Sequence, residues 1–402
     1  METLLDSGKN LGEPPLIMTI KNKSFSQPAR TGLRRWQNYL PVGLTLALPR
    51  LLRAEDHVDY RFEYYAEDNN RMTIQTHSVY FEQKLDDAVT AKGEIVYDGI
   101  SGATPLGTHD TSGKIILAKV EDVRTAGNLE LETRLGKHTL TPGFAYSQEH
   151  DYTSYGLSLN DAIEFNDKNT ILQLGASHNF DSVRHADRKT WSDKEGTEGL
   201  IGISQLLTPK TIFTAAFTFG NDSGYLSDPY RLAEYHPNIF PAGFNIGVPE
   251  RRPSHRNKEI LYTSLTQYFE PIDASLEGSY RFYNDSYGVL AHTVGLTWHQ
   301  RLGKHLIVEP LFRVYEQSAA SFYSPTFTGP FTTDPAGFHS SDYRLSNFYS
   351  LDYGLQITGV INDHLHIVAG YHRYEMNGLD GKTSAAMYPK ANVFTIGISI
   401  LW

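Results

Sequence analysis

The chain contains 402 residues, of which 40% are hydrophobic and none is cysteine, and its formal net charge is −10. The lack of cysteine excludes disulfides and thiolate-bound zinc or iron–sulfur centres, and the acidic balance argues against a nucleic-acid partner. No apolar run reaches the roughly eighteen residues of a transmembrane helix, whereas a barrel of strands that alternate apolar and polar residues stays compatible with this composition.

The first 54 residues differ from the rest and predict an export signal. A basic segment precedes the apolar stretch 39–48, and the chain turns acidic after Ala54. This is the order of a secretory signal with cleavage near Ala54. Because the signal begins late, we expect Met18 to be the true start; the alternative is a short amphipathic helix on a soluble domain. Residues 1–54 are thus predicted as extension and signal peptide, and 55–402 as the barrel.

From residue 58 onward the sequence alternates with a period of two, as in Val58, Tyr60, Phe62 and Tyr64. This is the pattern of strands with one apolar and one polar face. A soluble β-sandwich has the same period, but many segments exceed the usual five or six residues and carry aromatic residues at their ends, as membrane strands do. The expected strands are 58–66, 71–86, 88–99, 124–136, 138–150, 153–166, 169–180, 196–208, 211–221, 256–270, 272–284, 287–302, 305–318, 344–361, 364–376 and 391–402.

The connections between these strands alternate in length. The tight junctions are Asp86-Asp87, Gly136-Lys137, Asp167-Lys168, Pro209-Lys210, Pro271, Gly303-Lys304 and Asn362-Asp363, and the long ones are 100–123, 181–195, 222–255, 319–343 and 377–390. Short turns on one side and long loops on the other are typical of bacterial outer-membrane barrels. The predicted fold is therefore all-β: a transmembrane antiparallel up-and-down β-barrel of about sixteen strands, with short periplasmic turns and long extracellular loops, surrounded by outer-membrane lipid and lipopolysaccharide.

The last segment alternates without interruption from Phe394 and ends the chain on Trp402. It resembles the C-terminal strand signature by which the barrel-assembly machinery recognises outer-membrane proteins. We therefore expect Phe394 and Trp402 to act as the assembly signal, and the assembly machinery to be a partner.

A barrel of about sixteen strands can enclose an aqueous channel. The period of two assigns these charged residues to the lumen: Arg61, Glu63, Lys92, Glu94, Glu130, Glu132, Arg134, Glu164, Glu277, Arg281, Glu309 and Arg313. Such a lining can order water and select polar solutes, or it can form an ion-pair lattice that fills the barrel. The leading hypothesis is a channel or transporter for small polar solutes or a specific ligand.

The long connection 222–255 contains five prolines and five aromatic residues. A stiff loop of this kind either folds inward as a constriction or stays at the surface. Segment 221–224 and Asp228 offer oxygens suited to Ca²⁺, although turn residues have the same composition. The histidines form no ligand motif and no nucleophile–base pair is visible. We expect no metal site, no cofactor and no enzymatic activity.

Several stretches resemble the motifs of a known family: 76–83, 93–94, 97–105, 177–181, 222–230, 251–256, 279–285, 317–323 and 340–346. Their family-motif loop residues are Asp98, Ser101, Gly102, Asp228, Pro229, Tyr230, Arg252 and Pro253. Over nearly all of 58–402 the chain resembles the domain-of-unknown-function 3570 family of predicted outer-membrane barrels, with Phe282 and Ser321 as departures from its pattern.

The resemblance implies the fold and location already expected. Members of that family are often encoded beside thioredoxin-like and flavin-transferase proteins, which implies an envelope redox or flavinylation context. The second hypothesis is therefore a non-conducting barrel scaffold that docks a periplasmic or surface partner protein.

Overall fold

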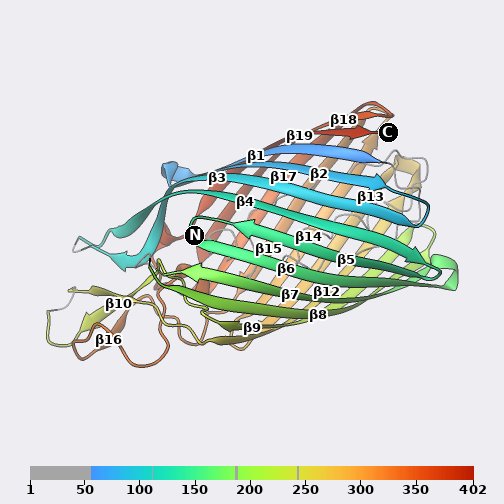
Figure 1. Cartoon of the computed structure of the whole chain (residues 1–402). Helices are drawn as coiled ribbons and strands as arrows, with labels where there is room; N and C mark the ends of the chain where they lie inside the picture. Colours follow the sequence, from blue (N-terminus) through green and yellow to red (C-terminus); the bar gives the residue numbers. More distant parts are fainter. Residues whose placement is uncertain (1–55, 111, 186–188, 242–243) are drawn as a thin grey trace.

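The computed structural model describes residues 56–402 apart from 111, 186–188 and 242–243. Within this part of the chain, sixteen antiparallel strands close into a barrel (Figure 1), which confirms the predicted fold. No helix among the described residues is long and apolar enough to cross a membrane. The predicted extension 1–54, with its start and cleavage sites, lies outside the described residues.

The barrel strands have the following bounds: β1 (His57–Glu67), β2 (Met72–Lys84), β3 (Val89–His109), β4 (Ile115–Leu135), β5 (His138–Gln148), β6 (Tyr152–Phe165), β7 (Thr170–Arg184), β8 (Trp191–Thr208), β9 (Thr211–Gly224), β12 (His255–Phe269), β13 (Ala274–Asp285), β14 (Leu290–Leu302), β15 (Leu306–Gln317), β17 (Phe348–Asn362), β18 (Leu365–Gly378) and β19 (Lys390–Leu401). The short 3₁₀ helices are η2 (Asp68–Asn70), η3 (Asn166–Lys168), η4 (Glu270–Ile272), η5 (Tyr343–Leu345) and η6 (Ala385–Met387).

Closure of the barrel provides hydrogen-bond partners for the backbone N–H and C=O groups, which lipid cannot provide. β1 pairs with β2 on one side and with β19 on the other, from His57 opposite Leu401 to Glu67 opposite Ala391. Among the described strands no barrel edge is left unpaired, as a membrane-spanning sheet requires. Outward residues such as Tyr60 are 40% exposed while their neighbours on the other face are buried, so the period of two places apolar side chains toward lipid.

The two rims of the barrel differ. Turns of a few residues join β2 to β3, β4 to β5, β6 to β7, β8 to β9, β12 to β13, β14 to β15 and β17 to β18, while the long connections lie at the opposite rim (Figure 1). β1 begins and β19 ends at the rim with short turns. By this asymmetry the rim with short turns is periplasmic and the other is extracellular.

Several predicted boundaries at the extracellular rim are wrong; for example, 181–184 and 191–195, expected in a loop, belong to β7 and β8. The expected loop 100–123 is mostly ladder, because β3 and β4 continue pairing as far as His109 and Ile115, with a register shift after Pro105. Backbone hydrogen bonds extend this hairpin beyond the point where the apolar alternation ends. The alternation ends because these side chains do not face lipid, and the sequence pattern therefore did not indicate strands there. Residues 344–347, expected at the start of a strand, belong instead to the preceding connection, and β17 begins at Phe348.

The long connections carry structure of their own. β10 (Leu232–Pro237), β11 (Ile246–Pro249) and β16 (Phe327–Gly329) form a small sheet in the order β11-β10-β16, which projects beyond the barrel strands (Figure 1). β10 pairs with β11 in antiparallel fashion and with β16 in parallel fashion. An apolar core at this end of the barrel combines strand residues with loop residues, including Tyr283, Tyr315, Tyr343, Leu345 and Met387.

Candidate functional site

The predicted lumen residues lie on the strand faces that alternate with lipid-exposed apolar residues. Arg61, Glu63, Lys92, Glu132, Glu277, Glu309 and Arg313 are buried, Glu94, Glu130, Glu164 and Arg281 are partly buried, and Arg134 is exposed. The strands place them there because each inward position recurs at every second residue. Their common orientation follows from the period, whereas their pairing depends on strand register.

Ion pairs between these residues run along the wall of the barrel. Arg61 Nη2 lies 2.5 Å from Glu63 Oε2 on the same strand, and Lys92 pairs with Glu132 on the adjacent strand. Arg313 Nη2 lies 3.9 Å from Asp352 Oδ2, again on the neighbouring strand. These pairs hold charges against the wall and do not bridge opposite sides of the barrel.

A further cation on the inward face was not among the predicted residues. Lys258 Nζ lies 3.0 Å from both Glu198 Oε1 and Asp222 Oδ1, which come from β8 and β9. The same period of two places all three side chains on the inward face, so the sequence pattern could have predicted their orientation. Because Asp222 is occupied by this lysine, segment 221–224 does not present its carboxylate to Ca²⁺.

Two connections fold together at the extracellular mouth, and we call them the cap: residues 225–241 and 244–254 between β9 and β12, and 318–347 between β15 and β17. Arg251 and His339 exchange backbone hydrogen bonds of 2.9 Å in both directions. Ser340 Oγ donates to Glu250 Oε2 at 2.6 Å. The cap is therefore one folded unit made from two segments distant in sequence.

Six buried charges join the two segments of the cap, and we call them the cap network: Asp228, Arg231, Glu250, Arg252, Asp342 and Arg344. Arg344 Nη2 donates to Asp228 Oδ2 at 2.7 Å, and Arg344 Nε donates to Asp342 Oδ1 at 2.8 Å. Arg252 Nη2 donates to Asp342 Oδ2 at 2.9 Å. Three carboxylates thus match three guanidinium groups, which is the condition for burying charge.

The three carboxyl groups of the cap network differ in the direction in which their surroundings shift the pKa. Burial alone would raise the pKa of Asp228 and of Asp342, but Arg344 and Arg231 hold the pKa of both carboxyls well below the usual range. Burial raises the pKa of Glu250, with Arg252 opposing and the charges of Asp228 and Asp342 adding to the rise. At neutral pH the two aspartates are therefore firmly ionised anchors of the network.

The cap crosses the barrel mouth along a diameter. On one side, Gln317 Nε2 of β15 donates to the Arg344 carbonyl oxygen at 3.0 Å. On the other side, the Tyr230 hydroxyl donates to Asp151, in the turn between β5 and β6. Asp228 links the two, since it pairs with Arg344 and accepts from the Tyr230 amide at 2.9 Å. Seven strands separate β15 from β5 in one direction and six separate β15 from β6 in the other, so this chain of contacts spans the mouth.

Further contacts fix the cap to the wall and to neighbouring connections at the same rim. Arg231 Nη2 donates to Thr104 Oγ1 of β3 at 3.0 Å, and the hydroxyls of Ser346 and Tyr388 lie 2.8 Å apart. The Tyr287 hydroxyl donates to the Pro253 carbonyl oxygen at 2.8 Å. Connection 222–255, for which a constriction and a surface loop were both considered, is thus part of a folded cap that is anchored at several points of the extracellular rim.

The family-motif residues divide between the cap and the wall. Asp228, Pro229, Tyr230, Arg252 and Pro253 lie in the cap. The other three lie within β3: Asp98 is in the predicted strand 88–99, whereas Ser101 and Gly102 were expected in loop 100–123 and that expectation is wrong.

Asp98 and Gly102 have different roles in β3. Asp98 accepts from Thr76 Oγ1 at 2.6 Å and from Arg124 at 3.2 Å. Gly102 has a φ of +135°, and a Cβ there would lie 2.3 Å from the Arg71 carbonyl oxygen. Glycine and serine predict turns, but this glycine permits a close approach of two backbones inside a ladder.

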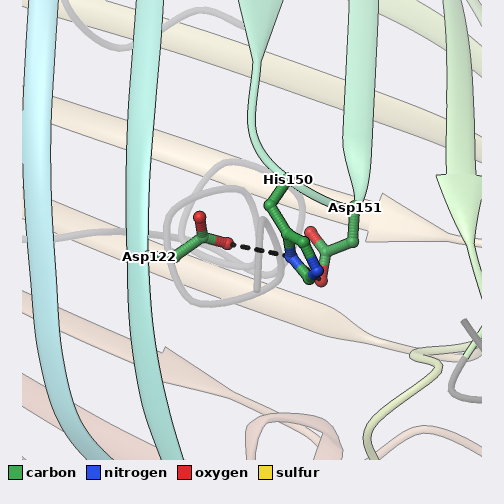
Figure 2. A group of neighbouring side chains, drawn as sticks. All are labelled: Asp122, His150 and Asp151. Carbon is green, nitrogen blue, oxygen red and sulfur yellow. Dashed lines mark ion pairs between the residues drawn. The ribbon is translucent and has the colours of Figure 1, made fainter.

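Close to the Tyr230 anchor, side chains from β4 and the β5–β6 turn form what we call the rim cluster: Asp122, Glu149, His150 and Asp151. His150 Nδ1 lies 3.8 Å from Asp122 Oδ2 and 3.7 Å from Asp151 Oδ2 (Figure 2). Burial raises the pKa of Glu149 to about 7, with the charges of Asp122 and Asp151 adding to the rise and Arg124 opposing it.

Sequence reasoning did not find the rim cluster. His150 and Asp151 are adjacent, which is no ligand motif, and only strand pairing brings β4 beside them. Phe394 and Trp402, the predicted assembly signal, are 50% and 56% exposed on the outer surface of the last strand and at the chain end.

A search of curated proteins found no match. Among solved structures, a bacterial polysaccharide outer membrane secretin is 10% identical with a TM-score of 0.47, over 87% of this chain and 99% of that chain. OmpT of Vibrio cholerae is 8% identical with a TM-score of 0.45, over 88% and 100%. The siderophore receptor PirA of Pseudomonas aeruginosa is 10% identical with a TM-score of 0.42, and this chain spans only 62% of its length.

A closed barrel of sixteen antiparallel strands with apolar residues toward lipid is the architecture of a bacterial outer-membrane protein. The sequence model of one family matches residues 44–114, 115–191 and 184–399. This is the family that the motifs resembled. The chain belongs to the family described as Protein of unknown function (DUF3570).

Proposed function

We propose that the protein is a channel for small polar solutes whose cap restricts the extracellular mouth. The observation that carries this proposal is the inward face, where charged residues pair along the wall. A barrel of this strand number is wide enough for water, and charges held at the wall select solutes by sign and polarity. The proposal involves no catalytic step, and it includes assembly through the C-terminal residues Phe394 and Trp402.

The cap supplies a closed state for such a channel. Its contacts reach Gln317 on one wall and Asp151 on the other, and it is held by ion pairs that can separate without breaking the barrel ladder. Loops that fold over a pore are a common means of setting its size. The open state then requires the cap network and the contacts between the cap and the barrel to separate.

Single-channel conductance of the refolded protein in planar lipid bilayers tests this proposal, with heat-modifiable migration on a gel as the check of folding. We expect discrete conductance steps, and we expect Arg313→Gln to shift selectivity toward cations because one inward positive charge is lost. Arg373→Gln is the matched control, since this arginine pairs with Asp68 outside the lumen and its loss should leave selectivity unchanged. A folded barrel without any conductance contradicts the proposal.

A second candidate function, a non-conducting scaffold for a surface partner, is favoured by one observation. The projecting part of the cap exposes four large apolar side chains: Ile239 at 71%, Phe244 at 43%, Phe331 at 55% and Phe338 at 54%. Phe244 and Phe331 both lie against the ring of Phe240, and exposed apolar groups close together are typical of protein-binding surfaces. Under this alternative the partner is a cell-surface protein, because this part of the cap lies beyond the extracellular rim.

Conductance and cross-linking together separate the two candidates. The scaffold predicts a folded but silent barrel, and a cross-linked partner in cells that is lost in a Phe331→Asp variant. Leu207→Asp is the control, since Leu207 is equally exposed, at 55%, but lies near a periplasmic turn. A conducting barrel whose cross-links are unchanged by Phe331→Asp would leave the channel as the only candidate.

A further inference from the structure

The rim cluster gathers three metal-binding side chains at the extracellular mouth. Asp122 comes from β4, and His150 and Asp151 form the tip of the turn between β5 and β6. One ligand atom from each lies within 4.8 Å of the other two. Figure 2 shows the three side chains, with the Asp122 carboxylate directed at the His150 ring. Three converging donors from two chain segments form a partial coordination shell.

Buried oxygens beside these donors have no partner. Asp151 Oδ1 and both carboxyl oxygens of Glu149 are buried and accept no hydrogen bond from any described residue. The neighbouring guanidinium does not satisfy them, because Arg124 is directed at Ser147 and Asp98. A buried carboxylate without a partner is costly, and three acidic groups sharing this space repel one another. Both observations indicate that a positive charge belongs among them.

We propose that Asp122, His150 and Asp151 bind a divalent first-row transition cation such as Zn²⁺. Imidazole nitrogen and carboxylate oxygen suit such cations, whereas Ca²⁺ prefers oxygen ligands only. Ligand atoms about 2.0–2.2 Å from a zinc ion lie about 3–4 Å from each other, and the two distances from His150 Nδ1 are 3.8 and 3.7 Å. The third distance, between the two carboxylates, is within 4.8 Å, so binding of the cation requires the three side chains to move closer together.

A cation in this position is directly coupled to the cap. Asp151 is the residue that accepts the hydrogen bond from Tyr230, the cap anchor on this side of the barrel. A bound cation fixes the Asp151 carboxylate and joins the β5–β6 turn to β4, so it stabilises the anchored position of the cap. The binding site itself exists whether or not the barrel conducts, and its test does not depend on conductance.

Calorimetric titration with Zn²⁺ tests the site on the full-length protein, refolded without a histidine tag and stripped with a chelator. We expect one tight site per chain, not displaced by equimolar Ca²⁺. Replacing one ligand should weaken binding by at least about 100-fold, since outer-shell partners alone typically contribute 10- to 100-fold. His150→Ala removes the nitrogen ligand, and Asp122→Asn removes a ligand from the other segment with almost no change in shape.

His138→Ala is the matched control, because His138 Nδ1 lies 2.7 Å from Asp161 Oδ2 at the periplasmic end of β5 and β6, the two strands that the turn with His150 joins. We expect this variant to bind Zn²⁺ like the unmodified protein. Heat-modifiable migration shows that each variant is folded. The proposal is overturned if the unmodified protein lacks a tight site, or if folded His150→Ala and Asp122→Asn both retain it.

Discussion

The substitution Asp228→Asn tests whether the cap network holds the barrel mouth closed. It keeps the shape of the side chain and the hydrogen bond from the Tyr230 amide, but it removes the charge that faces Arg344 at 2.7 Å and Arg231 at 3.4 Å. All three side chains are buried, so solvent does not replace the lost partner.

The size of the effect follows from this burial. Removing one partner of a buried ion pair costs about 3–5 kcal/mol because the other charge stays buried. Arg344 retains Asp342 as a second partner, so the lower end, about 3 kcal/mol, applies. Since each 1.4 kcal/mol is a factor of ten, the ratio of open to closed cap should rise by roughly 10²-fold.

Two measurements report this ratio. In planar bilayers the fraction of time spent conducting should rise in the Asp228→Asn variant. In limited proteolysis of the folded barrel, cleavage within the cap should accelerate by a similar factor, because cleavage of a transiently open segment follows its population. Asp334→Asn is the control within the same cap, since Asp334 pairs with Arg251 at the exposed surface, where ion pairs contribute little.

The reasoning is refuted if a folded Asp228→Asn barrel matches the unmodified protein in both open fraction and cap proteolysis. Faster proteolysis without added conductance would show that the cap opens but that it is not what closes the pore. An equal effect of Asp334→Asn would show that the response is unspecific.

Three further predictions concern pH, backbone geometry and assembly. The folded pKa of Asp228 and of Asp342 lies well below the ordinary value of 3.8, so their stabilisation of the cap is complete above that pH and starts to be lost only below it. Glu250 has a raised pKa and stabilises the cap as it becomes protonated. The open fraction, recorded from pH 7 to pH 3, should therefore fall slightly and should begin to rise only below about pH 3.8. Gly102→Ala places a methyl group on a residue with a φ of +135°, close to the Arg71 carbonyl oxygen. It should destabilise the barrel by about 1–3 kcal/mol and lower the temperature at which the folded band on a gel is lost. Gly99→Ala is the control and should leave this temperature unchanged, because the nearest atom to the added methyl group is 4.0 Å away. Phe394→Ala should reduce the amount of assembled barrel in outer-membrane fractions without preventing refolding in detergent. Phe312→Ala, at a residue with similar lipid exposure, should assemble normally. Equal assembly of both variants would rule out a signal at Phe394.

The sequence determined the strands, their order and their faces, because lipid on one side and polar surroundings on the other impose a period of two on every strand. The same period placed residues such as Arg61 and Glu309 on the inward face without any coordinates. Connection length alone then assigned the two rims. These features are local, so each can be read from a short window of residues.

Only the tertiary structure decided what fills the extracellular mouth. Asp228 and Arg344 are 116 residues apart, and no local pattern indicates that loops so distant pair with each other. Asp122 meets His150 because β4 pairs with β5, and a shift of register by one residue would separate them. The extension of β3 and β4 beyond the membrane also escaped prediction, since backbone pairing continues there without the alternation that lipid enforces.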